Sequence, residues 1–149
     1  MIVVDTNILV YAHRRETAHH KEALKWLTAL AEGVPAWAIP VFCLGEFLRV
    51  VTHARLFDPP SRLSEALDAL AGLLASPSVR ILNPGDRYPG LFADTVREAD
   101  ARGNLVFDAQ IAALCREHGC NRLLTLDRDF ARFRNLKLLS IADSPDTSR

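Results

Sequence analysis

The sequence predicts an α/β fold in which a mainly parallel central sheet is flanked by helices. Short apolar segments of strand length alternate with segments of helical periodicity, and Gly, Pro and Asp residues separate them. Such alternation is typical of parallel sheets covered on both faces. The 149 residues, 49% of them hydrophobic and 24% charged, suit one packed domain. We expect this domain to cover residues 1–143, and a frayed tail to follow over 144–149.

The first half of the chain contains two strand-like and three helix-like segments. Met1-Ile2-Val3-Val4 predicts a buried strand, and Asp5-Thr6-Asn7 carries residue types that begin helices. Apolar residues then recur at three and four positions, with Pro and Gly at the segment ends. The remaining predictions are a helix over 17–33, a strand over 36–39, a helix over 40–54 opened by Pro40, and a helix over 61–75.

The second half repeats this alternation. Residues 79–82 are expected to form an edge strand, and residues 122–126 a strong strand. Helices are expected over 86–102 and 108–119, each closed by a glycine. A short helix beginning at Asp127 and a final strand over 136–139 complete the predicted elements.

Charge and hydropathy narrow the range of functions. Eighteen Lys and Arg balance eighteen Asp and Glu, so any nucleic-acid activity must come from a local site rather than from an overall positive field. No apolar stretch approaches the roughly 20 residues of a membrane span, and no basic region precedes the first apolar run. We therefore expect a cytoplasmic protein without a membrane segment or signal peptide.

The three cysteines suit a reducing compartment, because an odd number cannot form a closed disulfide framework. Cys115, His118 and Cys120 are spaced closely enough to suggest a zinc site. Its fourth ligand would have to be Cys43, from a distant segment that carries no motif. Buried or surface thiols are the favoured interpretation.

Four carboxylates stand out by their positions. Asp5 and Asp127 each follow a predicted strand, and ligands of open α/β sheets gather at such strand ends. Glu46 lies on a helix that is apolar on most sides and is expected to be deeply buried, where an isolated charge is costly. Asp108 immediately precedes an apolar helical pattern. The structural alternatives are helix caps for the aspartates and an ion pair with Arg49 for Glu46.

Together the four acids favour a metal site over separate structural roles. Carboxylates gathered in water-poor surroundings repel one another, and a hard divalent cation relieves that repulsion. Ligands that are all oxygen suit Mg²⁺ or Mn²⁺. Such a site can activate water and stabilise both the attacking and the leaving oxygen of an in-line phosphodiester displacement. This chemistry points to a nuclease.

The four acidic segments, in this order, resemble the PIN domain from Met1 to about Leu139. They are Val4-Asp5-Thr6-Asn7, Gly45-Glu46-Phe47, Asn104-Leu105-Val106-Phe107-Asp108-Ala109 and Thr125-Leu126-Asp127-Arg128-Asp129-Phe130. Residues 49–60 are in addition similar to the VapC-type toxins of type II toxin–antitoxin systems. The resemblance implies an Mg²⁺- or Mn²⁺-dependent endoribonuclease, a homodimer, and a cognate antitoxin that occupies the active-site groove. DNA contact is expected through the antitoxin only.

The resemblance also implies roles for the acids. Asp5 and Asp108 become catalytic metal ligands, and Glu46 and Asp127 complete the cluster. Asp129 is an alternative ligand, ranked below Asp127 because Asp127 is nearer the strand end. This sequence carries Phe107 and Gln110 where relatives often have proline and histidine, a departure that bears on substrate contacts and leaves the acids untouched.

Two further groups of residues are candidates for supporting roles. Hydroxyl and amide side chains near the acids can orient them, although capping is an equal explanation; these are Thr6, Asn7 and Thr125. Cationic or imidazole side chains can bind RNA phosphates, although solvation is the simpler explanation; these are Arg14, Arg15, Arg49, His53 and Arg55.

Two other function classes share part of this pattern. Aspartyl-phosphate phosphatases also place an aspartate after the first strand, but they need a second acid two residues later, where this chain has Asn7. A non-catalytic PIN-like binding or interaction module is the remaining alternative, with the acids as caps and ion pairs. Retention of all four acids argues against it.

Overall fold

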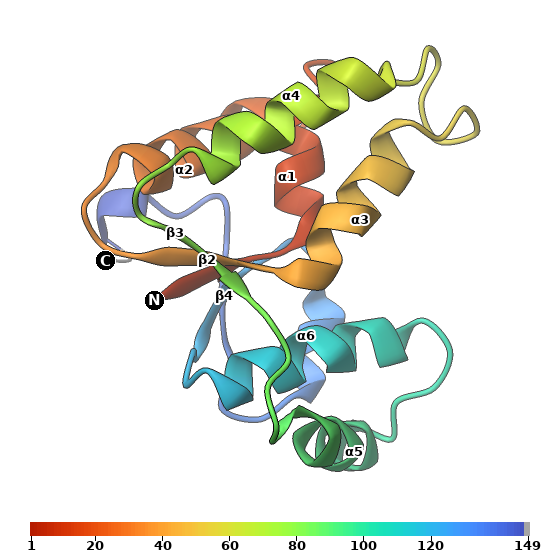
Figure 1. Ribbon diagram of the computed structural model, residues 1–149, viewed down its shortest axis with the longest axis vertical. Coiled ribbons are helices and arrows are strands. Elements are labelled where there is room, and N and C mark those ends of the chain that lie inside the picture. Colours follow the sequence, from red (N-terminus) through yellow and green to blue (C-terminus); the bar gives the residue numbers. More distant parts are fainter. Residues whose placement is uncertain (148–149) are drawn as a thin grey trace.

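A five-stranded parallel sheet forms the centre of the protein in the computed structural model, which describes residues 1–147 (Figure 1). The strands pair in the order β3-β2-β1-β4-β5, with parallel register throughout. Their bounds are β1 Ile2–Val4, β2 Trp37–Pro40, β3 Val79–Leu82, β4 Arg122–Leu124 and β5 Lys137–Leu139. The prediction of an α/β fold is confirmed, and β3 lies at an edge as expected.

Within residues 1–147, six α-helices cover the sheet. They are α1 Thr6–His13, α2 His20–Glu32, α3 Val41–Val51, α4 Leu63–Leu74, α5 Tyr88–Ala99 and α6 Leu105–Glu117. In Figure 1, α1, α2 and α4 lie on one side of the sheet and α5 and α6 on the other. Two 3₁₀ helices follow, η1 Arg128–Arg132 and η2 Pro145–Thr147. None of the helices described in residues 1–147 is both long and apolar enough to cross a membrane.

The core is the sheet itself together with one stripe from each covering helix. Every residue of β1 and β2 is buried, which is why these strands are continuous apolar runs rather than alternating ones. Burial of each large aliphatic side chain contributes about 1.5–3 kcal/mol. Trp26 of α2 is also buried, and its Nε1 donates to the Ile141 carbonyl at 3.2 Å. The segment after β5 is thereby tied to the same core.

Several element boundaries differ from the predictions. Pro40 ends β2, where it pairs with Leu82, and is also the N-cap of α3, so the helix proper begins at Val41. Helix α3 stops at Val51, where the Thr52 hydroxyl donates to the Leu48 carbonyl at 2.6 Å. Helix α6 begins three residues before Asp108. Local sequence propensity predicts the ends of helices and strands poorly, because tertiary contacts decide at which of several neighbouring residues an element ends.

The predicted tail over 144–149 includes a short helical segment. Residues 145–147 form η2, which contacts α2, and Pro145 is buried. Residues 148 and 149 of the predicted tail lie outside the described part of the chain.

Candidate active site

Asp5 stands at the junction of β1 and α1, at the middle of the sheet's carboxyl edge. Its amide donates to the Leu124 carbonyl of β4 at 3.1 Å, which continues the pairing of the two strands. Its Oδ1 accepts a 2.7 Å hydrogen bond from the Thr6 amide and caps α1. The residue is only 7% exposed. Capping and site roles can coexist here because each carboxylate oxygen has two lone pairs and can accept more than one interaction.

Thr125 connects three of the predicted site residues. Its hydroxyl donates to Asp5 Oδ2 at 2.7 Å, and its Oγ1 accepts from Asn7 Nδ2 at 3.2 Å and from the Asp127 amide at 3.0 Å. Thr125 is itself buried, one residue after β4. A single hydroxyl therefore positions the Asp5 carboxylate relative to the loop that carries Asp127.

Glu46 faces the same site from α3. The Thr6 hydroxyl donates to its Oε2 at 3.2 Å, and none of the ion pairs formed within residues 1–147 joins it to Arg49. The expected deep burial of Glu46 is wrong, because it is half-buried and its neighbours Gly45 and Arg49 are exposed. Helix α3 buries Cys43, Phe47 and Val51 and leaves the opposite face open.

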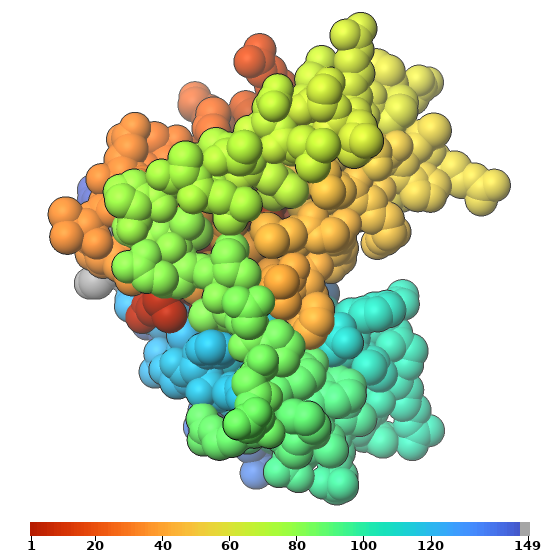
Figure 2. All heavy atoms as spheres, in the orientation of Figure 1, coloured from red at the N-terminus to blue at the C-terminus, as the bar shows by residue number. Residues whose placement is uncertain are grey.

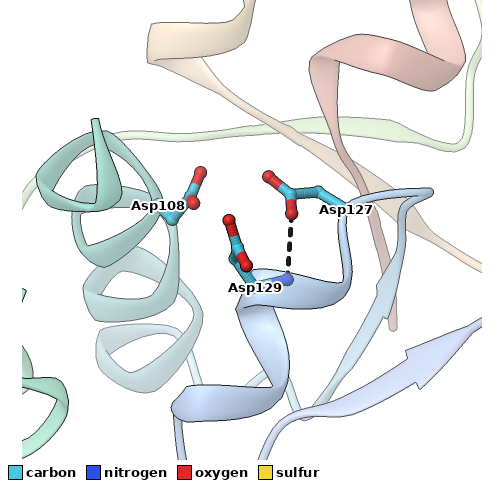
Figure 3. Close-up of side chains that lie close together, drawn as sticks. All are labelled: Asp108, Asp127 and Asp129. Carbon is cyan, nitrogen blue, oxygen red and sulfur yellow. Dashed lines mark hydrogen bonds between the residues drawn. The ribbon is translucent and has the colours of Figure 1, made fainter.

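Asp108, Asp127 and Asp129 form the acidic triad of the site. One carboxylate oxygen from each lies within 4.8 Å of the others. Figure 3 shows the three side chains converging from α6 and from the start of η1. Asp127 Oδ1 accepts from the Asp129 amide at 2.9 Å and caps η1, whereas Asp108 lies in the first turn of α6 and caps nothing. No other such His, Cys, Asp or Glu group occurs in residues 1–147.

Burial and mutual repulsion raise the pKa of two of these groups. Burial raises the pKa of Asp5 to about 6, opposed by the hydrogen bonds from Thr125 and Thr6 and assisted by the charges of Glu46 and Asp127. Burial, together with the charges of the surrounding carboxylates, raises the pKa of Asp108 to about 7, and Asp127 contributes most among those charges. The site thus carries more negative charge than its protein surroundings neutralise.

This donor set fits a hard divalent cation. Five carboxylates face one region, and none of them takes part in an ion pair within the described residues. Oxygen ligands without nitrogen or sulfur are those that Mg²⁺ and Mn²⁺ prefer. Cys43, Cys115 and Cys120 are buried free thiols and lie outside the acidic group.

The acids open into a cleft of about 640 Å³, here called the acidic cleft. Its walls combine the acids with aromatic and aliphatic side chains, of which the sequence pointed only to Phe107. The main ones are Tyr11 of α1, Leu56 and Phe57 of the loop between α3 and α4, and Phe107 of α6. Phe107 lies directly beside Asp108 and is the residue whose departure from the family pattern bears on substrate contacts.

The five candidate RNA-binding residues divide by position. Arg49 lines the acidic cleft, and Arg15 lines a separate hollow with α2 and α4 residues. His53 Nδ1 accepts from the Arg55 amide at 3.1 Å, and neither residue lines the cleft. Arg14 points instead into the loop between α3 and α4. The structure thus places one of the five, Arg49, beside the acids.

Arg14 fastens the loop between α3 and α4 to α1. Its Nη2 donates to the Pro59 carbonyl at 2.8 Å and its Nη1 to Ser61 Oγ at 3.0 Å. Its guanidinium carbon lies 4.5 Å from the centre of the Phe57 ring, and its side chain is only 12% exposed. Arg14 therefore stabilises the loop whose Phe57 lines the acidic cleft.

Several known proteins are similar to this chain in sequence or in fold. The PIN domain family model matches residues 2–136. Ribonuclease VapC43 of Mycobacterium tuberculosis is 39% identical over 137 residues, 92% of each chain. The crystal structure of Rickettsia felis VapBC2, bound to a DNA fragment from their promoter, matches with a TM-score of 0.69 at 22% identity, over 94% of this chain and 98% of that one. The structure of M. tuberculosis VapC20, a sarcin–ricin loop cleaving toxin, matches with a TM-score of 0.64 at 23% identity, over 92% and 99%.

Proposed function

The chain belongs to the PIN-domain family, and from that premise we propose that it is an endoribonuclease of the VapC type, the toxin of a toxin–antitoxin pair. It hydrolyses RNA phosphodiester bonds. The observation that carries this assignment is the convergence of five carboxylates, none of them in an ion pair within the described residues, at the carboxyl edge of the sheet and on the floor of an open cleft. A non-catalytic module has no need to collect charges that oppose one another.

The proposed cofactor is Mg²⁺ or Mn²⁺. Asp5 and Asp108 would hold it together with Asp127 and Asp129, and Glu46 would complete the acidic group. When bound, such an ion supplies a Lewis acid and lowers the pKa of water for attack on a phosphodiester. The choice between Asp127 and Asp129 need not be exclusive, because both carboxylates converge on Asp108.

The protein's own groups set the geometry of this reaction. The Thr6 amide and the Thr125 hydroxyl hold both oxygens of Asp5, and the Thr6 hydroxyl holds Glu46. Fixed hydrogen bonds of this kind orient ligands that would otherwise rotate, and their loss typically lowers metal affinity or activity about 10- to 100-fold. We assign Thr6, Asn7 and Thr125 this positioning role.

The partners follow from the same family. An RNA substrate enters the acidic cleft, and a cognate antitoxin inhibits the chain and carries the contact to DNA. The R. felis VapBC2 structure, which holds a DNA fragment from the promoter, supports this part of the proposal. We propose a homodimer and a cytoplasmic location, the latter in keeping with three free thiols.

The test is cleavage of a labelled structured-RNA pool by purified, antitoxin-free protein in Mg²⁺, in Mn²⁺ and in chelator. Asp5→Ala and Asp108→Ala should abolish metal-dependent cleavage. Asp94→Ala is the matched control, because Asp94 is an exposed acid on α5 paired with Arg97. Folding of each variant is checked by circular dichroism. Absence of cleavage by the folded wild-type protein in either metal would favour the binding-module alternative.

A further inference from the structure

A second hollow of about 660 Å³ adjoins the acidic cleft between α3 and α6 and is here called the side hollow. Glu46, Arg49, Asn104 and Phe107 line both spaces, so the two are continuous. Phe42 and Gln110 line the side hollow only. Figure 2 shows the outline of the molecule notched between the yellow-orange end of α3 and the teal start of α6. A chain lying across the acids therefore has room to place a side group here.

Phe107 is the unusual member of this lining. Its side chain is 61% exposed, and among the Phe, Tyr and Trp residues described it is the only exposed one. Every other aromatic ring packs partly or fully into the protein. Phe107 also makes no ring contact within residues 1–147. An aromatic face left in water next to a phosphodiester site is available for stacking against a planar group of the substrate.

Polar groups without partners surround this ring. Gln110 lies three residues after Phe107 and thus on the same face of α6, and its side-chain amide forms no hydrogen bond within residues 1–147. The same is true of the Asn104 side chain at the start of α6. A free amide offers both donors and an acceptor, the pattern that pairs with base edges.

Arg49 lies where the side hollow meets the acids. It is exposed, and none of the ion pairs within the described residues involves it. It is also the only Lys or Arg among the described residues that line either space. A cation at this junction suits a phosphate that precedes or follows the one at the acids.

We propose that the side hollow is a subsite for one unpaired RNA base beside the scissile phosphate, with Phe107 stacking on the base, the Gln110 and Asn104 amides contacting its edge, and Arg49 binding the adjoining phosphate. This inference rests on the proposed function. The base must be unpaired, because in a duplex both the base faces and the Watson–Crick edges are already occupied. The substrate class is therefore single-stranded RNA or a loop, rather than a continuous helix.

The test is binding of a single-stranded RNA hexamer that carries 2-aminopurine, beside a blunt duplex of the same length. Binding is measured with Mg²⁺ in the Asp108→Asn background, where cleavage does not consume the probe. Phe107→Ala should weaken hexamer binding about 5- to 100-fold and reduce the stacking quench of 2-aminopurine. Phe107→Trp should retain both. Leu63→Ala is the matched control, since Leu63 is equally exposed at 61% but lies on α4 away from either hollow.

A smaller loss that depends on the identity of the base is expected for Gln110→Ala. The inference is overturned if Phe107→Ala binds the hexamer as tightly as the parent, if the duplex binds equally well, or if neither RNA binds. Cleavage of the RNA pool by the otherwise wild-type protein separates the two proposals. Cleavage that is unaffected by Phe107→Ala contradicts the subsite and keeps the nuclease. Hexamer binding through Phe107 without any cleavage contradicts the nuclease and keeps only a base-binding site.

Discussion

The Thr125 hydroxyl donates a 2.7 Å hydrogen bond to Oδ2 of Asp5, and this bond joins the segment after the central strand β1 to the segment after its neighbour β4. The same Oγ1 accepts from the Asp127 amide. One buried hydroxyl thus couples the most buried acid of the site to the loop that carries Asp127 and Asp129. The geometry of the carboxylates consequently depends on a side chain that carries no charge.

We predict that Thr125→Val lowers metal affinity and RNA cleavage about 10- to 100-fold, because the variant keeps the shape of the side chain and removes the hydrogen bond that orients Asp5. Thr125→Ser should recover most of the loss. Thr52→Val is the control, because its hydroxyl bonds only to the Leu48 carbonyl within α3 and its C-cap. Mn²⁺ titration followed by electron paramagnetic resonance supplies a readout that a purely structural defect does not move. Equal Mn²⁺ affinity of Thr125→Val and the parent would contradict the positioning role.

Without divalent metal, the site should become destabilising as the pH rises. The pKa values of Asp5 and Asp108, about 6 and about 7, lie above their ordinary value, so the folded state favours the protonated acids. That contribution is fully present below about pH 4 and is lost as the pH rises through 6 to 7. Urea unfolding in chelator at pH 5 and pH 8 measures it.

Asp108→Asn should remove part of this pH dependence and be more stable than the parent at pH 8 in chelator. The expected difference is on the order of 1 kcal/mol, reduced from the full linkage value because water reaches the half-buried Asp108 and screens its charge. Asp94→Asn serves as the control on an exposed acid. A clear loss of stability in Asp108→Asn at pH 8 would mean that the Asp108 carboxylate stabilises the fold rather than destabilises it.

The Asp127→Ala and Asp129→Ala variants should differ more in stability than in metal binding. Asp127→Ala removes both a ligand and the cap of η1, whose loss costs about 1 kcal/mol. Asp129→Ala removes an exposed ligand without disturbing a cap. Mg²⁺-dependent shifts in Tm should fall in both variants, whereas the free energy of unfolding in chelator should fall only for Asp127→Ala. An undiminished Mg²⁺ shift in Asp129→Ala would exclude that carboxylate from the metal site.

We predict that Arg14 has a structural role and that Arg49 binds RNA. Arg14→Gln loses hydrogen bonds to Pro59 and Ser61, and we expect about 1–3 kcal/mol of lost stability with an unchanged salt dependence of RNA binding. Arg49→Gln should leave stability unchanged and lower the slope of log affinity against log salt by about 1. Fluorescence binding at several salt concentrations measures this slope. If Arg14→Gln instead reduced the slope of log affinity against log salt, Arg14 would be shown to contact RNA.

Much of the site was predictable because its chemistry lies at the ends of sheet strands. Asp5 and Asp127 could be selected from the apolar segments before them, and both prove to cap the helix that follows while facing the cleft. Asp108 was expected near a helix start, where a cap was the structural alternative. It lies in the first turn of α6 instead, because the helix begins at Leu105. Glu46 was expected to need a partner, which is the Thr6 hydroxyl rather than Arg49.

The sequence by itself determined the α/β class, the order of the elements and the acids at the strand ends, because periodicity and turn residues are local properties of the chain. Only the tertiary structure decided that β4 lies beside β1, that Thr125 reaches Asp5, and that Arg14 turns inward to the loop between α3 and α4. It also decided that Phe107 and Gln110 meet α3 across a hollow. These relationships join segments far apart in the chain, and their energies come from strand pairing and packing, which no local pattern encodes.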